Sequence, residues 1–348
     1  MRGFIVFFVA AFLAAPAHAK ERGTVVGYIA AFKGIDREMQ QRGLDRYTHL
    51  MLAFVNPTPT AEVVASGGLA CSPTGPDSSV MVSDAQLRTL VTDAHRDRTK
   101  VIASLGGAVI PPCGGDWAQL LAPNMRARLV ANLIGMVDRY DLDGLDIDLE
   151  GELMTGIDKA GNYTPFVRAL ADALHARGKI LSAATGSYPG GMLPDASLPF
   201  FDLIGIMSYD QVGPTWGDPG AEHSTYAQAL ADLTLWIGKG VPARKLALGM
   251  PFYGRGFGSY RPGWSMQDIV DQFGDHQLNA DVAGQRCGGC SYISYNGLPT
   301  LERKAELAGA WGAGVMVWEV GQDLDDGRAI RRVTHAYEKG RSDARNRR

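Results

Sequence analysis

Short apolar segments alternate with segments of helical period along almost the whole chain. The apolar segments predict eight strands: Thr24–Phe32, Tyr47–Asn56, Lys100–Gly107, Gly144–Glu150, Ile180–Thr185, Leu203–Tyr209, Leu246–Tyr253 and Gly314–Trp318. The helical segments predict a helix capped by Ser83 and running to about His95, and helices over Met125–Tyr140, Tyr163–Arg177, Tyr226–Gly238 and Asp326–Glu338. Continuously apolar strands that alternate with helices are typical of a closed parallel sheet. The sequence therefore predicts an α/β fold, a (β/α)₈ TIM barrel.

One interval, about 256–300, breaks this rhythm. The stretch between the seventh and eighth strands is too long for a single βα loop, and it is rich in glycine, aromatic and polar residues. Within it, the run Tyr292–Tyr295 is a candidate strand. We therefore expect a small insertion on the active-site face of the barrel, at the carboxyl ends of its strands.

The fourth predicted strand is acidic on one face. Side chains alternate along a strand, so Asp146, Asp148 and Glu150 share a face, and the large apolar residues between them share the other. Buried carboxylates are costly, and three of them this close must share protons. One is thereby kept protonated near neutral pH, as a general acid requires. Asp143 falls off this face and is expected to be structural.

Two other interpretations of these acids remain open. The strand could be a solvated acidic edge, although the intervening residues are all large and apolar. The oxygens could also hold Ca²⁺ or Mg²⁺, although the sequence has no EF-hand-type loop. Acid catalysis fits the position better, because Glu150, Tyr209 and Trp318 end three different strands, and TIM-barrel active sites lie at the carboxyl ends of the strands.

Length and charge narrow the class of protein. A chain of 348 residues and 37.3 kDa is long enough for one large domain, and its formal net charge of −3 indicates no nucleic-acid or membrane partner. The basic residues Arg341–Arg348 are expected to form a solvated, frayed tail (341–348).

The N-terminus resembles a secretory signal over residues 1–19. Arg2 precedes the apolar run Phe4–Ala15, and Ala17-His18-Ala19 is a small-x-small cleavage site. No later run is long and apolar enough to span a bilayer. We expect a secreted protein, extracellular or periplasmic, that begins at Lys20.

Export makes disulfides plausible for the four cysteines, Cys71, Cys113, Cys287 and Cys290. Three pairings are possible. The favoured one joins Cys287 to Cys290 across two glycines and Cys71 to Cys113. A zinc site and a redox pair are the alternatives for the C-x-x-C.

Five motifs in order resemble glycoside hydrolase family 18, the chitinases. Asp143-x-x-Asp146-x-Asp148-x-Glu150 matches the D-x-x-D-x-D-x-E signature of that family. The supporting matches are Ser104–Gly107, Met207–Asp210, Gly249–Arg255 and Gly314–Glu319. The resemblance covers the mature chain and assigns residues 20–340 to the catalytic barrel.

The resemblance implies a retaining mechanism assisted by the substrate. Glu150 would protonate the glycosidic oxygen, and the substrate's acetamido oxygen would attack the anomeric carbon. Asp148 would orient the acetamido N–H and stabilise the oxazolinium ion, and Tyr209 would donate to the acetamido oxygen. Asp146 would share a proton with Asp148.

The resemblance also implies the substrate contacts. Trp318 would be the platform under the reacting sugar, and Tyr28 and Ser104 would hydrogen-bond Asp146. The other expected contacts are Met207, Asp210 and Arg255. Trp117, Trp216 and Trp264 lie in predicted loops and are either outer subsites or ordinary aromatics.

The expected function is a secreted chitinase acting on chitin or chito-oligosaccharides, as a monomer without metal or cofactor. An endo-β-N-acetylglucosaminidase acting on N-glycans or peptidoglycan-related glycans would use the same acids. A chitin-binding, chitinase-like lectin is the alternative from another class, although such proteins typically lack the acid that Glu150 supplies here.

Overall fold

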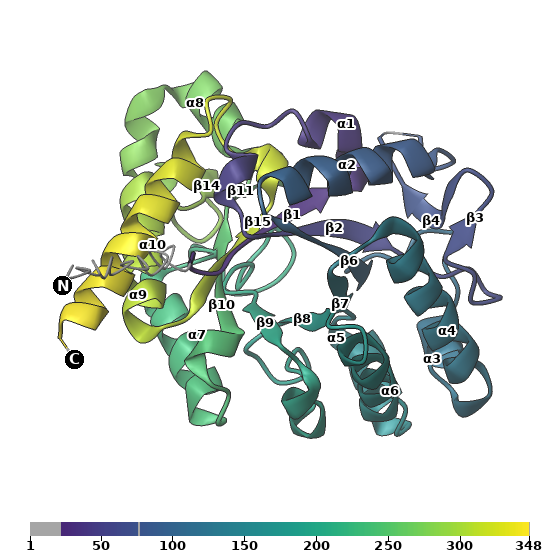
Figure 1. The fold of residues 1–348 in the computed structure, drawn as a ribbon. Helices are drawn as coiled ribbons and strands as arrows, with labels where there is room; N and C mark the ends of the chain where they lie inside the picture. Colours follow the sequence, from purple (N-terminus) through teal and green to yellow (C-terminus); the bar gives the residue numbers. More distant parts are fainter. Residues whose placement is uncertain (1–21, 76, 348) are drawn as a thin grey trace, which may run out of the picture.

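Eight parallel strands close into a barrel in the computed structural model, which describes residues 22–75 and 77–347 (Figure 1). The predicted signal segment 1–19 lies outside these residues. In chain order the barrel strands are β1 (Val25–Ala30), β2 (His49–Val55), β6 (Lys100–Gly106), β7 (Gly144–Asp148), β8 (Ile180–Thr185), β9 (Leu203–Ile206), β10 (Leu246–Pro251) and β15 (Gly314–Trp318). Sequence neighbours pair around the barrel, and β15 closes it against β1. The predicted TIM barrel is confirmed.

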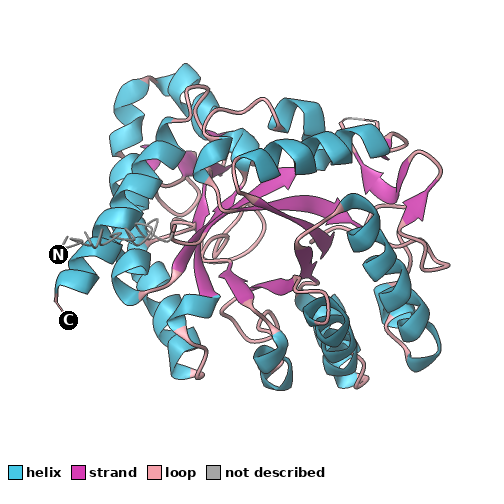
Figure 2. Ribbon diagram, viewed as in Figure 1, coloured by secondary structure: helices cyan, strands magenta, loops and turns pink. Residues whose placement is uncertain are grey.

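Helices surround the barrel on its outside (Figure 2). They are α1 (Ile35–Glu38), α2 (Asp84–Arg96), α3 (Trp117–Leu120), α4 (Pro123–Tyr140), α5 (Gly151–Lys159), α6 (Tyr163–His175), α7 (Tyr226–Gly238), α8 (Met266–Phe273), α9 (Leu298–Trp311) and α10 (Arg328–Asn346). Short 3₁₀ segments lie at Ala31–Lys33, Leu44–Arg46, Asp195–Phe200, Ala243–Lys245, Asp275–Asn279 and Val320–Gln322. In the described ranges, no helix has both the length and the apolar character needed to cross a bilayer.

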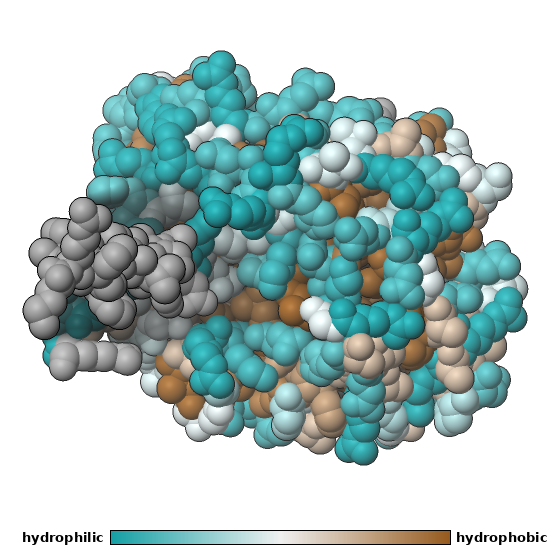
Figure 3. All heavy atoms as spheres, viewed as in Figure 1, coloured by the Kyte–Doolittle hydropathy of each residue, from teal (hydrophilic) through white to brown (hydrophobic). Residues whose placement is uncertain are grey.

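The strands are apolar on both faces because both faces are covered. On β2, Leu50 and Leu52 point outward into the layer under the helices, whereas Met51 and Ala53 point into the barrel. Polar side chains predominate toward the edges of the face shown in Figure 3, and apolar side chains gather toward its middle. The Ser83–Gln86 capping box at the start of α2 is also confirmed.

The predicted insertion between β10 and α9 is confirmed as a small antiparallel sheet with α8. Its strands, in the order β12-β11-β14-β13, are β11 (Tyr253–Gly256), β12 (Gly263–Ser265), β13 (Val282–Gly284) and β14 (Tyr292–Ser294). Trp264, Ile269 and Ile293 form part of its own core. A second small sheet contains β3 (Val64–Ala65), β4 (Gly68–Pro73) and β5 (Met81–Ser83).

Both predicted disulfides are present. Cys71 of β4 is bonded to Cys113, with the Cα atoms 5.6 Å apart, and Cys287 is bonded to Cys290 in the insertion. The first bond ties the small β3–β5 sheet to the loop that follows β6.

Several predicted boundaries were wrong. β7 ends at Asp148 and β9 at Ile206, so Glu150 and Tyr209 lie just beyond their strands. β9 is short because its pairing with β10 ends at Ile206, after which the chain leaves the barrel. The predictions also omitted α5 and α9.

α10 continues to Asn346, so residues 341–346 are helical rather than frayed, although their side chains are exposed or half-buried. Before this basic segment, Val333, Tyr337 and Gly340 repeat at helical spacing, and all three are buried. Gly340 lies so close to α9 that an added Cβ would stand 2.3 Å from the Glu306 carbonyl oxygen. α10 is therefore packed closely against α9 at Gly340.

A pair of glycine substitutions tests this packing. Gly340→Ala should lower the free energy of unfolding by about 1 to 3 kcal/mol, because the new methyl overlaps backbone that cannot easily move. Gly135→Ala, in α4 where nothing lies within 4 Å, should raise it by roughly 0.5 to 1 kcal/mol. Urea unfolding of both variants gives the comparison. A stabilised Gly340→Ala protein would mean that α10 does not pack against α9 at this point.

Candidate active site

The acidic residues lie where the barrel interior meets its carboxyl end. On β7, Asp146 and Asp148 point into the barrel and are only 1% and 3% exposed, while Leu145 and Ile147 join the outer core. Glu150 follows two residues after β7, at the start of α5, and is partly exposed. The alternation inferred from the sequence is thus confirmed, and the solvated-edge interpretation is wrong because the strand is central.

Three hydroxyl groups converge on Asp146. Tyr28 Oη and Ser104 Oγ donate to Oδ2 at 3.0 and 2.7 Å, and Ser182 Oγ donates to Oδ1 at 2.7 Å. Ser104 and Ser182 are its register partners on β6 and β8. Burial raises the pKa of Asp146, while the three hydrogen bonds lower it, and the net pKa lies above the ordinary value. These bonds fix the carboxyl group at the base of the site.

Asp148 is the least satisfied member of the row. Its Oδ1 atom is buried and has no hydrogen-bond partner among the described residues. Burial, followed by the charges of Glu150 and Asp146, holds the pKa of Asp148 well above its usual value. A buried carboxyl oxygen without a partner costs free energy. It is therefore ready to accept a hydrogen bond from a bound molecule.

Glu150 has the pKa that an acid catalyst needs. Burial, and then the charge of Asp210, raise its pKa from 4.5 to about 7. At neutral pH a substantial fraction of Glu150 therefore carries a proton that it can transfer. Glu150 is at the same time only partly buried, unlike Asp146 and Asp148.

One wall of the site is polar and comes from β9, its following loop and β11. A cavity of about 700 Å³ is lined there by Tyr188, Met207, Tyr209, Asp210 and Trp216, among others. Arg255 Nε donates to Asp210 Oδ1 at 2.8 Å, and the guanidinium lies 5.5 Å from the centre of the Trp216 ring. Burial alone would raise the pKa of Asp210, but hydrogen bonds from Arg255 and His223 bring it below its usual value. Asp210 is therefore a fixed negative charge.

The other wall is aromatic. Trp318, at the end of β15, lies 5.3 Å from the ring centre of Tyr28 and 5.7 Å from that of Phe54, on which it stacks. Phe32 stacks in turn on Phe54. Trp318, Phe54, Phe32 and Val109 are among the residues that line a cavity of about 390 Å³. Flat aromatic faces of this kind suit the C–H face of a sugar ring.

The structure brings together all ten residues predicted for catalysis and substrate contact. Of the three loop tryptophans, only Trp216 lines a cavity of the site: Trp117 is 1% exposed and bonded to Asn56, and Trp264 is in the insertion core. Asp143 accepts hydrogen bonds from Val101 and His95 and is structural, as expected.

Sequence reasoning missed Ser182, Tyr188, His223 and Phe54. Ser182 had a partial signal, since it and Thr185 are the polar residues of the predicted strand Ile180–Thr185, but its pairing with Asp146 depends on the register of β8 with β7. Tyr188 and His223 lie in loops whose position depends on distant parts of the chain, whereas Phe54 lies in a predicted strand, β2, at an irregularity of register between Ala53 and Val55.

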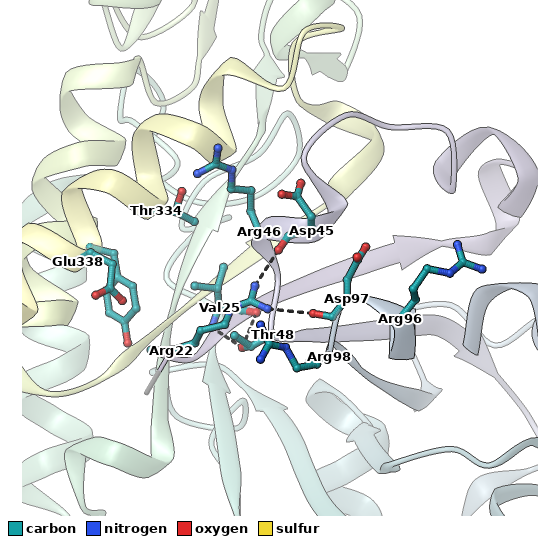
Figure 4. A pocket seen from close by; sticks show the side chains of 12 residues that line it. Arg22, Val25, Asp45, Arg46, Thr48, Arg96, Asp97, Arg98, Thr334 and Glu338 are labelled. Carbon is teal, nitrogen blue, oxygen red and sulfur yellow. Dashed lines mark hydrogen bonds between the residues drawn. The ribbon is translucent and has the colours of Figure 1, made fainter. Parts of the chain in front are cut away.

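A cavity of about 630 Å³ lies at the opposite end of the barrel, beside the starts of β1 and β2 (Figure 4). There the Arg22 guanidinium donates to the main-chain carbonyls of Asp45, Tyr47 and Asp97. These are structural bonds between loops. In the ranges that the structure describes, no three His, Cys, Asp or Glu residues are grouped as a metal site would require.

The fold is a (β/α)₈ barrel, and buried carboxyl groups lie at its carboxyl end between an aromatic and a polar wall. This combination of fold and site is that of a glycoside hydrolase. The chain belongs to glycosyl hydrolases family 18, whose family description matches residues 24–323.

Similar proteins agree with this assignment. The GH18 chitinase ChiB of Flavobacterium johnsoniae is 28% identical, with a TM-score of 0.74 over 92% of this chain and 95% of that one. A class V chitinase of Arabidopsis thaliana is 26% identical over 81% of this chain and 82% of its own length. A chitinase-like effector of Moniliophthora roreri is 29% identical over 61% of this chain, and the match spans 53% of the effector, about half its length.

The raised pKa of Glu150 predicts a pH-dependent stability cost. The unfolded group, with a pKa near 4.5, ionises before the folded one, with a pKa of about 7. The folded state therefore binds more protons in this window, and stability falls as pH rises through it. Glu150→Gln removes this cost. At pH 8 the free energy of unfolding of the variant should therefore exceed that of wild type by about 1 to 3 kcal/mol, whereas at pH 4.5 the two should differ little.

Urea unfolding at the two pH values measures this difference. Glu152→Gln is the control, because Glu152 is exposed on α5 two residues further along. Equal pH dependence of wild type and Glu150→Gln would show that Glu150 ionises normally in the fold.

Proposed function

We propose that this chain is a secreted chitinase that cleaves β-1,4 bonds between N-acetylglucosamine units with retention of configuration. The observation that carries the proposal is the row Asp146, Asp148 and Glu150: the outermost acid is partly protonated near neutral pH, and the middle one has a buried oxygen without a hydrogen-bond donor. The signal-like N-terminus and the two disulfides support export. We further propose that it acts as a monomer on chitin or chito-oligosaccharides.

Each residue has a role in the proposed reaction. Glu150 transfers its proton to the glycosidic oxygen as the bond from that oxygen to the anomeric carbon breaks. The acetamido carbonyl oxygen of the same sugar forms the new bond to that carbon and gives an oxazolinium ion. Asp148 accepts a hydrogen bond from the acetamido N–H, and its charge stabilises the oxazolinium ion. Tyr209 donates a hydrogen bond to the acetamido oxygen.

The second half returns the site to its starting state. Glu150, now a carboxylate, takes a proton from water as the water oxygen attacks the anomeric carbon and reopens the ring. Asp146, held by three hydroxyl donors, sits next to Asp148 on β7 and exchanges charge with it. Trp318 supports the reacting sugar from below.

The role of Glu150 is tested by replacing its proton donor alone. Glu150→Gln should bind chito-oligosaccharides but lose about 10³-fold or more in kcat on a fluorogenic chitobioside, since the variant cannot protonate the leaving oxygen. Asp148→Asn should also lower kcat severely, because it removes the charge beside the oxazolinium ion. Wild type that binds but never cleaves would favour the chitinase-like lectin, and full activity of Glu150→Gln would exclude the mechanism.

Substrate assistance predicts a strict need for an N-acetyl group. Fully deacetylated chitosan and cellulose should not be cut, a thiazoline analogue of the oxazolinium ion should inhibit, and the first product seen by NMR should be the β-anomer. An α-anomer as first product, or cleavage of cellulose, would show that another carboxylate acts. Release of the glycan from a high-mannose glycopeptide in preference to cleavage of chitin oligomers would identify an endo-β-N-acetylglucosaminidase.

A further inference from the structure

Lys304 of α9 is a fully buried lysine that the proposed mechanism does not use. Its side chain is 0% exposed, and Nζ donates to the Ser224 carbonyl at 3.1 Å, the Ser224 hydroxyl at 2.7 Å and Asn296 Oδ1 at 2.7 Å. Burial lowers the pKa of this amine to about 7, against the opposing charges of Asp281, Asp232 and Glu222. Such a group is costly to bury, so its contacts need an explanation.

The contacts lead from Lys304 to the catalytic loop. The Ser224 hydroxyl, which accepts from Lys304, donates to the Ser208 carbonyl at 2.6 Å, and Ser208 directly precedes Tyr209. Beside Ser224, His223 Nδ1 lies 3.3 Å from Asp210 Oδ1. The segment 223–224 thus holds the segment 208–210 at several points.

The same lysine also touches the end of the insertion. Asn296 Nδ2 donates to the Ser224 carbonyl at 2.6 Å, and the main-chain N–H of His223 donates to Ser294 Oγ at 2.9 Å. Lys304 therefore lies where α9, the insertion and the loop after β9 meet. Tyr209 lies three residues beyond the end of β9, outside the strand pairing that the structure describes for that strand.

We propose that Lys304 is a positioning residue: through Ser224 and the Ser208 carbonyl, it holds the Tyr209 phenol where it meets the acetamido group of the substrate. This inference rests on the proposed function, in which Tyr209 donates to the acetamido oxygen during attack. Lys304 itself does not touch the substrate.

A double-mutant cycle tests the inference. Lys304→Met keeps the length of the side chain and removes its donors; kcat on a chitobioside should fall roughly tenfold while KM changes less than about threefold. In a Tyr209→Phe background the same substitution should change kcat by less than about threefold, because the hydroxyl that Lys304 positions is gone. Lys245→Met is the control. Lys245 lies just before β10, at the other end of the barrel, and its Nζ donates to the Phe201 carbonyl. Removing this side-chain amine should leave kcat unchanged.

Each outcome decides the matter. Equal losses of kcat in both backgrounds, or no loss in the first, would overturn the positioning role even though wild type is active. Inactive wild type would refute the proposed function and this role together. If Lys304→Met does not fold, Ser224→Ala, which breaks the same path with a smaller change, should show the same dependence on Tyr209.

Discussion

The burial of three carboxyl groups at the end of one barrel strand is the constraint on which the rest of the site depends. Asp146 can be held 1% exposed only because three hydroxyl groups from β1, β6 and β8 surround it. In the same row, a buried oxygen of Asp148 has no donor among the described residues, and burial and then the charge of Asp210 raise the pKa of Glu150. Burying these acids costs stability, but it leaves Glu150 with a proton to transfer and Asp148 with an oxygen free to accept a hydrogen bond.

Pattern predicts the barrel and the acids because both depend on local order along the chain. Alternation within β7 is enough to place Asp146 and Asp148 on the inner face, and the number of apolar segments is enough to predict a closed sheet. Pattern fails where position depends on contacts between distant segments. Ser182 is a donor only because β8 pairs in register with β7, and His223 meets Asp210 only through the insertion. At the C-terminus, the run of basic residues predicted a frayed tail, but α10 continues through it to Asn346.

The two walls of the cleft contribute differently. Trp318, Phe54 and Phe32 offer flat apolar area that accepts a sugar face with little demand for orientation. The opposite wall sets orientation: the ion pair between Asp210 and Arg255 is fixed, directional and close to Glu150. The charge of Asp210 therefore has a second effect, since it helps keep the proton on Glu150. In the proposed function, Asp210 on the polar wall therefore affects both the orientation of the sugar and the pKa of Glu150. The aromatic wall affects sugar binding alone.

The catalytic groups are also held by two different means. The acids belong to β7 or follow it directly, so the hydrogen-bond ladder of the barrel places them. Tyr209 lies three residues beyond β9, where no ladder reaches, and a buried lysine with three acceptors holds that segment instead. Because one of those acceptors is Asn296, at the end of the insertion, a change in the insertion can move the phenol without moving the acids. In the proposed reaction, the acetamido contact can therefore vary while the acid that transfers the proton stays in place.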